Sequence, residues 1–340
     1  MMTRKERVKS AFKRTFADRV PAYPIVGGFA AQLVNKTVKD YLTDTETLVA
    51  AQLAANQRYS PDIVVIMADL LMEVEALGGK LTFPDNAVCY MKDHVLEEKS
   101  ALSRMQIPDP LQDGRLPLYL DACRIISNQI KDAPVGGVLT GPWSIAASLR
   151  GVENIIFDTF KDPVFVHELL HFCTMVAKRV GDALLSTGTG LSYSEPTGSC
   201  SVISPSIYRK FIKAHHIELV EYFREKRAAV TFHICGNVNP IMEDLVETGA
   251  PAISIDSISS LEKMIRVADK RTVVIGNVDT NAFESGSREQ IESETRRCIA
   301  DAASSGAFIL ASACEVPPTA TPESVDYFMD AAVKYGTNVK

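Results

Sequence analysis

The sequence predicts a (β/α)8 barrel that spans residues 1–340 as a single domain. Eight apolar runs of strand length alternate with helix-like segments, and eight such units close naturally into a barrel of parallel strands. The chain length of 340 residues is also normal for this fold. An open, doubly wound sheet is the alternative, and the count of eight favours the barrel. The expected strands cover residues 20–28, 62–69, 135–143, 191–195, 228–235, 252–256, 272–278 and 307–314.

Helix signals lie between these strands. An amphipathic segment at the N-terminus precedes the first strand and predicts an extra helix there. Ser204, followed by proline, begins a helix that runs to about residue 224. Ser287 is expected to be an N-cap, and Gln290 is expected to close a capping box with it. The connection 70–134 is long and must hold extra helices or a hairpin.

Composition excludes several classes of protein. The chain is 46% apolar and 23% charged, which is ordinary for a globular protein. Its net charge of −6 and its lack of a basic run argue against a nucleic-acid partner. No apolar stretch approaches the roughly 18 to 20 residues that a membrane helix needs. Seven cysteines, an odd number, without a signal peptide predict a cytoplasmic protein with reduced thiols.

Three residues with soft ligand atoms fall at predicted strand ends. His233 and Cys235 are two apart on one strand, so their side chains point to the same side. Cys314 ends another strand, and the barrel places both strand ends on one rim. One imidazole and two thiolates match a zinc site with an open fourth position. The alternative is that these cysteines merely fill the core, as free cysteines often do.

Polar or aromatic residues end other predicted strands, and the active site of a barrel lies at these ends. Glu195 is expected to be a proton donor or a fourth metal ligand, with a solvated rim carboxylate as the alternative. Glu315 follows Cys314 and should point away from it if the strand continues. Four more residues are expected to line the substrate pocket, or to support the ligands: Asp69, Trp143, Asp256 and Asn277.

Several segments along nearly the whole chain resemble the uroporphyrinogen decarboxylase superfamily. The strongest is His233-Ile234-Cys235-Gly236-Asn237, together with Cys314-Glu315-Val316-Pro317-Pro318. The others are residues 3–7, 18–21, 140–144, 203–205, 253–256 and 275–278. Within that superfamily the chain resembles the zinc-dependent methyltransferases that work with corrinoid proteins, whose His-x-Cys…Cys pattern matches His233, Cys235 and Cys314.

The resemblance implies Zn²⁺ as the metal and a corrinoid (cobalamin) carried by a separate partner protein. The enzyme would move a methyl group between cobalt and a small substrate. Glu315 beside a ligand, and the lack of a cation at residues 27–32, favour an O-methyl donor such as a methoxylated aromatic compound. Glu195 and Glu315 are then the candidates for the acid that protonates the leaving oxygen. Transfer to a thiol of the coenzyme M type is the alternative.

Two other functions stay open. True uroporphyrinogen decarboxylases use no metal, and their mark is an arginine-containing segment after the first strand. Residues 25–32 contain no arginine or lysine here, although a substrate with many carboxylates needs fixed cations. A non-catalytic barrel that binds a corrinoid protein is the third hypothesis. The sequence leaves the oligomeric state open, with a homodimer among the options.

Overall fold

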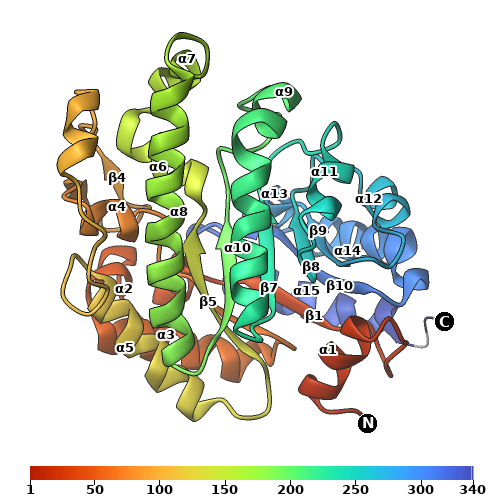
Figure 1. Ribbon diagram of the computed structural model, residues 1–340. Coiled ribbons are helices and arrows are strands. Elements are labelled where there is room, and N and C mark those ends of the chain that lie inside the picture. The colour runs from red at the N-terminus through yellow and green to blue at the C-terminus, as the bar shows by residue number, and fades with distance from the viewer. Residues whose placement is uncertain (338, 340) are drawn as a thin grey trace.

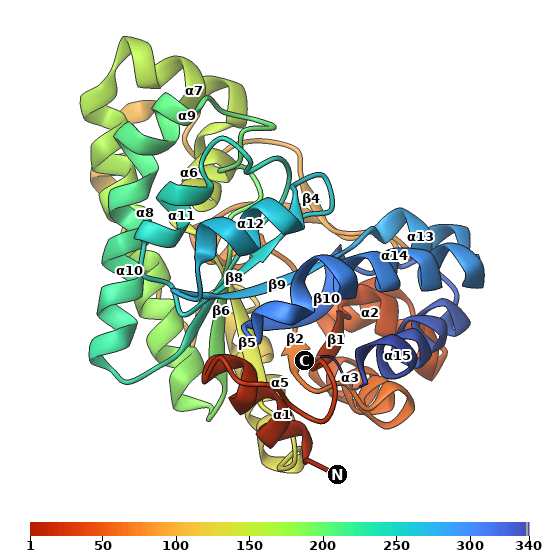
Figure 2. The ribbon, with the colours of Figure 1, turned by 90° about the vertical axis from the view of Figure 1, so that its right-hand side faces the viewer.

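Eight parallel strands form a nearly closed barrel in the computed structural model, which describes residues 1–337 and 339 (Figures 1 and 2). The order around the sheet is β1-β10-β9-β8-β7-β6-β5-β2. A backbone hydrogen bond of 2.8 Å from Asp62 N, just before β2, to Ala22 O in β1 links the two ends of this sheet. The predicted barrel and all eight predicted strands are therefore confirmed. The strands are β1 Ala22–Ile25, β2 Val64–Ile66, β5 Val135–Thr140, β6 Gly190–Ser194, β7 Val230–Ile234, β8 Ala252–Ile255, β9 Val273–Val278 and β10 Phe308–Glu315.

Helices cover the outside of the barrel (Figures 1 and 2). The α-helices are α1 Arg4–Phe12, α2 Val38–Thr43, α3 Thr45–Tyr59, α4 Met72–Ala76, α5 Leu116–Gln129, α6 Pro142–Arg150, α7 Val152–Lys161, α8 Pro163–Ser186, α9 Pro205–Ile207, α10 Lys213–Glu225, α11 Met242–Glu247, α12 Leu261–Ala268, α13 Thr280–Ser285, α14 Arg288–Ala302 and α15 Pro322–Gly336. Shorter helical turns are η1 Gly28–Val34, η2 Lys99–Arg104, η3 Tyr208–Ile212 and η4 Ala303–Ser305. No helix in the described residues is long and apolar enough to cross a membrane.

The long early connection contains both features expected of it. Helices α4 and α5 lie at its two ends, and a short antiparallel hairpin lies between them. The hairpin consists of β3 Leu81–Thr82 and β4 Tyr90–Met91. The connection therefore adds a small layer to the barrel without adding a strand to its wall.

The predicted helix starts are mostly confirmed. Ser204 caps α9, which continues through η3 into α10 as far as Glu225. Ser287 caps α14 by accepting a hydrogen bond from Gln290 N. The capping box, however, is incomplete, because the Gln290 side chain accepts from Ser285 Oγ at 2.8 Å instead. A nearby hydroxyl has replaced the backbone N–H that the box would use.

A buried ion-pair cluster fixes the N-terminal segment against the barrel. Asp62 is fully buried and accepts from Arg7 Nη1 and Arg19 Nη1, both at 2.6 Å. Its carboxylate also accepts from Ala22 N at 2.8 Å. Because a buried carboxylate needs such partners, this cluster holds α1 against the start of β1 and β2.

Apolar side chains inside the barrel form their own core cluster. Tyr23, Val273, Ile275, Ile309 and Ala311 belong to it and are almost completely buried. The larger core cluster packs the helices on the outside of the sheet. The inner cluster fills only part of the barrel, and the candidate site lies inside the barrel beside it.

Candidate metal centre

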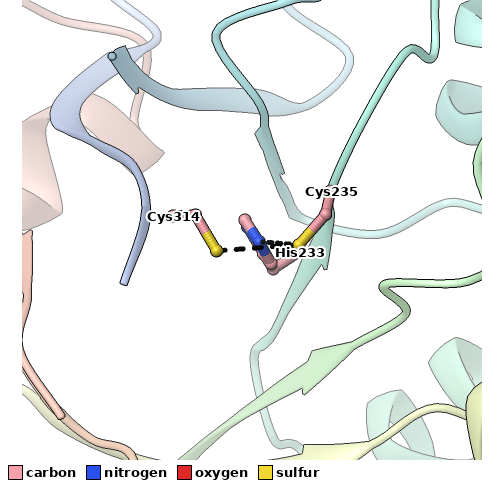
Figure 3. Close-up of side chains that lie close together, drawn as sticks. All are labelled: His233, Cys235 and Cys314. Carbon is pink, nitrogen blue, oxygen red and sulfur yellow. Dashed lines mark hydrogen bonds between the residues drawn. The ribbon is translucent and has the colours of Figure 1, made fainter. Parts of the chain in front are cut away.

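Three side chains converge inside the barrel, as Figure 3 shows. His233 belongs to β7, Cys235 follows the end of that strand, and Cys314 comes from β10. The two strands are three positions apart around the sheet, so only the curvature of the barrel brings them together. His233 Nε2 lies 3.2 Å from Cys235 Sγ, and Cys235 Sγ lies 3.7 Å from Cys314 Sγ. All three ligand atoms lie within 4.8 Å of one another.

These separations fit a tetrahedral zinc ion. Zinc–sulfur bonds of about 2.3 Å and zinc–nitrogen bonds of about 2.0 Å place two sulfurs about 3.8 Å apart, and a nitrogen and a sulfur about 3.5 Å apart. The distances of 3.7 Å between the sulfurs and 3.2 Å between nitrogen and sulfur are close to these values. The three residues are therefore arranged to hold a metal with one position left for a substrate.

The imidazole of His233 is held by a neighbour that the sequence analysis missed. Ser254 Oγ lies 2.9 Å from His233 Nδ1, and both residues are buried. A hydrogen bond at Nδ1 directs Nε2 towards the sulfurs and sets the ring's orientation, as is usual for metal-binding histidines. Ser254 belongs to the next strand, β8, and pairs with His233 in the parallel register, which the sequence alone does not show.

The two thiols shift each other's pKa in opposite directions. The contact with Cys235 lowers the pKa of Cys314 well below its usual value, and the nearby His233 ring lowers it further. The same sulfur–sulfur contact, reinforced by burial, raises the pKa of Cys235. A pair that readily gives up one proton is suited to a divalent metal, which binds thiolates and displaces the second proton.

Glu315 lines the same cavity as Cys314, contrary to the expectation from strand alternation. The cause is a register shift between β1 and β10: Tyr23 pairs with Ala311, but Ile25 pairs with Glu315. Such an irregularity turns the strand end and re-aims its side chains. Burial, and next the negative charge of Cys314, raise the pKa of Glu315 to about 8.

Two glycines make room for the Glu315 carboxylate. Its Oε1 accepts a hydrogen bond from Gly28 N at 2.7 Å. A Cβ atom at Gly27 would collide with the same oxygen. The segment after β1, which carries no cation, therefore holds this carboxyl group close to the metal ligands.

The structure places Glu195 on the other face of the sheet. Ser194 faces the cavity, so Glu195, one residue further, points outwards. Its carboxylate is fully buried and accepts from Trp143 N at 3.3 Å and Ser144 N at 2.5 Å, at the start of α6. His216 Nε2 lies 2.9 Å from it. These contacts correct the expectation of a rim acid: Glu195 caps a helix instead.

Trp143 belongs to the first turn of α6 and not to a strand end. The strand stops at Thr140, because Pro142 begins the helix. The indole is fully buried, and its Nε1 donates to Thr197 O at 3.1 Å. Trp143 is absent from the cavity lining, so the expected pocket contact is replaced by a packing position.

Asp69 follows β2 and forms an ion pair. Its Oδ2 accepts from Arg115 Nη1 at 2.7 Å, and its Oδ1 accepts from Leu71 N at 2.8 Å. Arg115 also binds Glu75 at 2.8 Å. The carboxylate is therefore engaged beside the cavity and does not line it.

Asp256 and Asn277 support the loops around the site. Asp256 Oδ2 accepts from Gly236 N at 2.8 Å, directly after Cys235. Asn277 is fully buried, and its Nδ2 donates to the carbonyl oxygens of Asp256 and Ser259 at 2.9 and 3.0 Å. Neither lines the cavity, which corrects the expectation of pocket contacts and fits the alternative of supporting residues.

Comparison with known proteins identifies the family. The family model for uroporphyrinogen decarboxylase (URO-D) matches residues 3–335. The chain belongs to the URO-D family. The resemblance on which the sequence analysis relied is thereby confirmed, and the barrel fold agrees with it.

Several proteins similar to this URO-D protein in sequence or structure are methyltransferases. It is 22% identical over 343 residues to the methylcobamide:CoM methyltransferase MtbA of Methanosarcina acetivorans, covering 98% of each chain. It is 24% identical over 231 residues to the methylcobamide:CoM methyltransferase MtaA of Methanosarcina barkeri, covering 67% of this chain and 66% of that protein. A solved methyltransferase from Methanosarcina mazei has the same fold, with a TM-score of 0.90, 24% identity, and coverage of 98% and 99%.

A further relative has a thiol in its name. The methylated-thiol–coenzyme M methyltransferase of Methanosarcina mazei is 26% identical over 254 residues, covering 73% of this chain and 66% of that protein. Uroporphyrinogen decarboxylases are also similar, such as that of Geobacter sulfurreducens at 22% identity over 307 residues. The methyltransferase names refer to coenzyme M and methylated thiols, and none of these names supports the expected O-methyl donor.

Proposed function

We propose that this protein transfers a methyl group between the cobalt of a corrinoid protein and a small thiol bound to zinc. His233, Cys235 and Cys314 hold the zinc through Nε2 and two Sγ atoms. The observation that carries the proposal is the convergence of these three ligand atoms at the cavity, with 3.7 Å between the sulfurs and all three atoms within 4.8 Å of one another. The names of the methyltransferase relatives support the thiol in preference to the methoxylated aromatic donor.

The ligand set suits this chemistry. When bound, the zinc lowers the pKa of a coordinated thiol and supplies a thiolate near neutral pH. The sulfur lone pair forms the new bond to the methyl carbon, and the cobalt–carbon bond breaks with its electron pair left on cobalt as cobalt(I). The reverse direction uses the same bonds. Ser254 holds the His233 ring throughout, so the ligand geometry does not have to rearrange.

Glu315 is the candidate proton carrier. Among the described residues that line the cavity, it is the one carboxylic acid. Because its pKa is raised to about 8, the Glu315 carboxyl group is mostly protonated near neutral pH and can return a proton to the thiolate released in the demethylating direction. In the thiol-methylating direction its deprotonated fraction accepts the thiol proton. Glu315→Gln keeps the size of the side chain and should slow transfer while leaving the metal in place.

Spectroscopy of the cobalt centre tests the proposed function. Methylcobalamin, or a methylated corrinoid protein, is mixed with a small thiol and the zinc-loaded enzyme, and the loss of the methyl-cobalt absorbance is followed. Cys235→Ser and Cys314→Ala should lose most of the zinc and most of the transfer while keeping the circular dichroism of the folded barrel. Cys200→Ser is the matched control, because Cys200 is also a half-buried free cysteine but lies outside the metal site.

Two results would contradict the proposal. Full zinc occupancy in both ligand variants would remove the assigned site. The second result is that cobalt(I) and a methoxylated aromatic compound form methyl-cobalt(III) while no thiol reacts. That result would favour the O-methyl donor instead. A metal-free decarboxylase is disfavoured because the described residues that line the cavity include no arginine or lysine to bind a polycarboxylate.

A further inference from the structure

The cavity beside the metal ligands has an apolar wall. Tyr23 and Ile25 from the β1 side, and Val65 and Met67 from the β2 side, form it. The two residues of each pair are two positions apart along the chain, so their side chains point to the same side, into the barrel. This wall is continuous with the inner core cluster, to which the same residues belong or against which they pack. A ligand group on this side must therefore be apolar.

The opposite wall carries hydroxyl groups. Ser192 and Ser194 from β6 and Thr231 from β7 line it. Ser192 pairs with Thr231, and Ser194 pairs with His233, in the parallel register of the two strands. Within the described residues these three hydroxyls make no hydrogen bond to another side chain or to the backbone, unlike Ser254, which binds His233. They are free to bind a polar group of a ligand.

No basic side chain lines the cavity within the described residues. Arg115 is not one of the lining residues, and it binds Asp69 and Glu75 at 2.7 and 2.8 Å. A sulfonate or carboxylate placed in the cavity would lose its water without gaining a counter-charge, which is strongly unfavourable. The cavity therefore selects against an anionic tail.

The free space is small. The cavity measures about 40 Å³. A water-sized group needs roughly 10 to 15 Å³ by this measure, so about three non-hydrogen atoms fit. A tail of two carbons and one hydroxyl has that number, whereas the tail of 2-mercaptoethanesulfonate has twice as many.

The direction of the tail follows from the reaction. The corrinoid must reach the metal from the open end of the barrel, where the strands end. A thiol on the metal must present its sulfur to cobalt, so its tail points away from the corrinoid and into the cavity. We propose that the thiol substrate has a short, uncharged tail that lies against Tyr23 and Val65 on one side and hydrogen-bonds Ser192 or Thr231 on the other. This inference rests on the proposed function and identifies the class of thiol.

Cobalt(II) substitution tests the inference without a corrinoid partner. The zinc is replaced by Co²⁺, and the thiolate-to-cobalt absorption band is titrated with four thiols: 2-mercaptoethanol, 1-propanethiol, cysteamine and 2-mercaptoethanesulfonate. We expect 2-mercaptoethanol to bind tightest and the sulfonate to bind at least about tenfold more weakly, because its charge is left unpaired. Equal or tighter binding of the sulfonate would overturn the inference and leave the proposed function intact. If no thiol changes the band, the proposed function fails as well.

Two variants test the hydroxyl wall itself. At least one of Ser192→Ala and the nearly isosteric Thr231→Val should weaken the binding of 2-mercaptoethanol by about fivefold, the value of one neutral hydrogen bond, and leave the binding of 1-propanethiol unchanged. Thr43→Val is the control, because Thr43 is an exposed hydroxyl on α2 and bonds only within its own helix. Equal weakening of both thiols, or no weakening in either variant, would show that the hydroxyls do not contact the tail.

Discussion

Ser254→Ala removes the hydroxyl that holds the metal-binding imidazole. The hydrogen bond between His233 Nδ1 and Ser254 Oγ is 2.9 Å long, and Ser254 and His233 are 1% and 8% exposed, so water cannot readily replace it. A buried, unpaired N–H costs about 1 to 3 kcal/mol. Loss of such an outer partner weakens metal affinity by about 10- to 100-fold, which corresponds to about 1.4 to 2.8 kcal/mol. The cost of the unpaired N–H and the usual effect of losing an outer partner are therefore of the same size. We expect the Ser254→Ala variant to bind zinc about 10- to 100-fold more weakly.

Competition with a chromophoric chelator at neutral pH measures this change directly. Ser192→Ala is the matched control, because Ser192 lines the same cavity but does not contact His233. Ser254→Thr should restore most of the affinity, since it returns the hydroxyl. Unchanged zinc affinity in Ser254→Ala would refute the view that this bond orients the imidazole.

Three further predictions concern stability. Gly181→Ala in α8 should lower the free energy of unfolding by about 1 to 3 kcal/mol despite the better helix propensity of alanine, because the new Cβ collides with the buried Phe223 ring; chemical denaturation measures it. Asp62→Asn should lower the free energy of unfolding by about 1.5 to 3 kcal/mol, since Arg7 and Arg19 lose the buried carboxylate that they share while Arg7 keeps Asp18, and an unchanged denaturation midpoint would contradict this. The Arg7 contact lowers the pKa of Asp18 from 3.8 to about 2. Asp18 therefore contributes about 2 kcal/mol to the free energy of unfolding above pH 4, and this contribution is lost as the pH falls towards 2. Asp18→Asn should remove this part of the pH dependence of the free energy of unfolding.

The barrel could be predicted because each strand carries its own signal. Apolar runs of strand length, proline at helix starts and serine caps are local features, and they gave all eight strands. The same local logic placed His233 and Cys235 on one side of β7, and the barrel brought Cys314 to them. What the sequence could not show is which neighbouring strand residue supports a ligand. Ser254 acts on His233 only through the register of β7 and β8.

The positions of the two candidate acids, Glu195 and Glu315, depend on contacts that the local sequence does not reveal. Alternation from Ser194 already implies that Glu195 faces outwards, and its partners, the start of α6 and the buried His216, come from distant segments. For Glu315 alternation fails, because the register between β1 and β10 shifts beside Ile25. A change of pairing partner depends on the neighbouring strand and has no signature within β10 itself. The sequence predicts that Trp143 ends a strand, but the strand stops at Thr140 and Pro142 already begins α6, so Trp143 lies in the helix.

X-ray absorption at the zinc edge tests the central claim most directly. The purified protein should contain about one zinc per chain, with two sulfur neighbours at about 2.3 Å and one imidazole nitrogen at about 2.0 Å. Addition of a short neutral thiol should raise the number of sulfur neighbours from two to three, because the thiol takes the fourth position beside His233, Cys235 and Cys314. A zinc shell without sulfur, or a sulfur count that no thiol changes, would contradict the account.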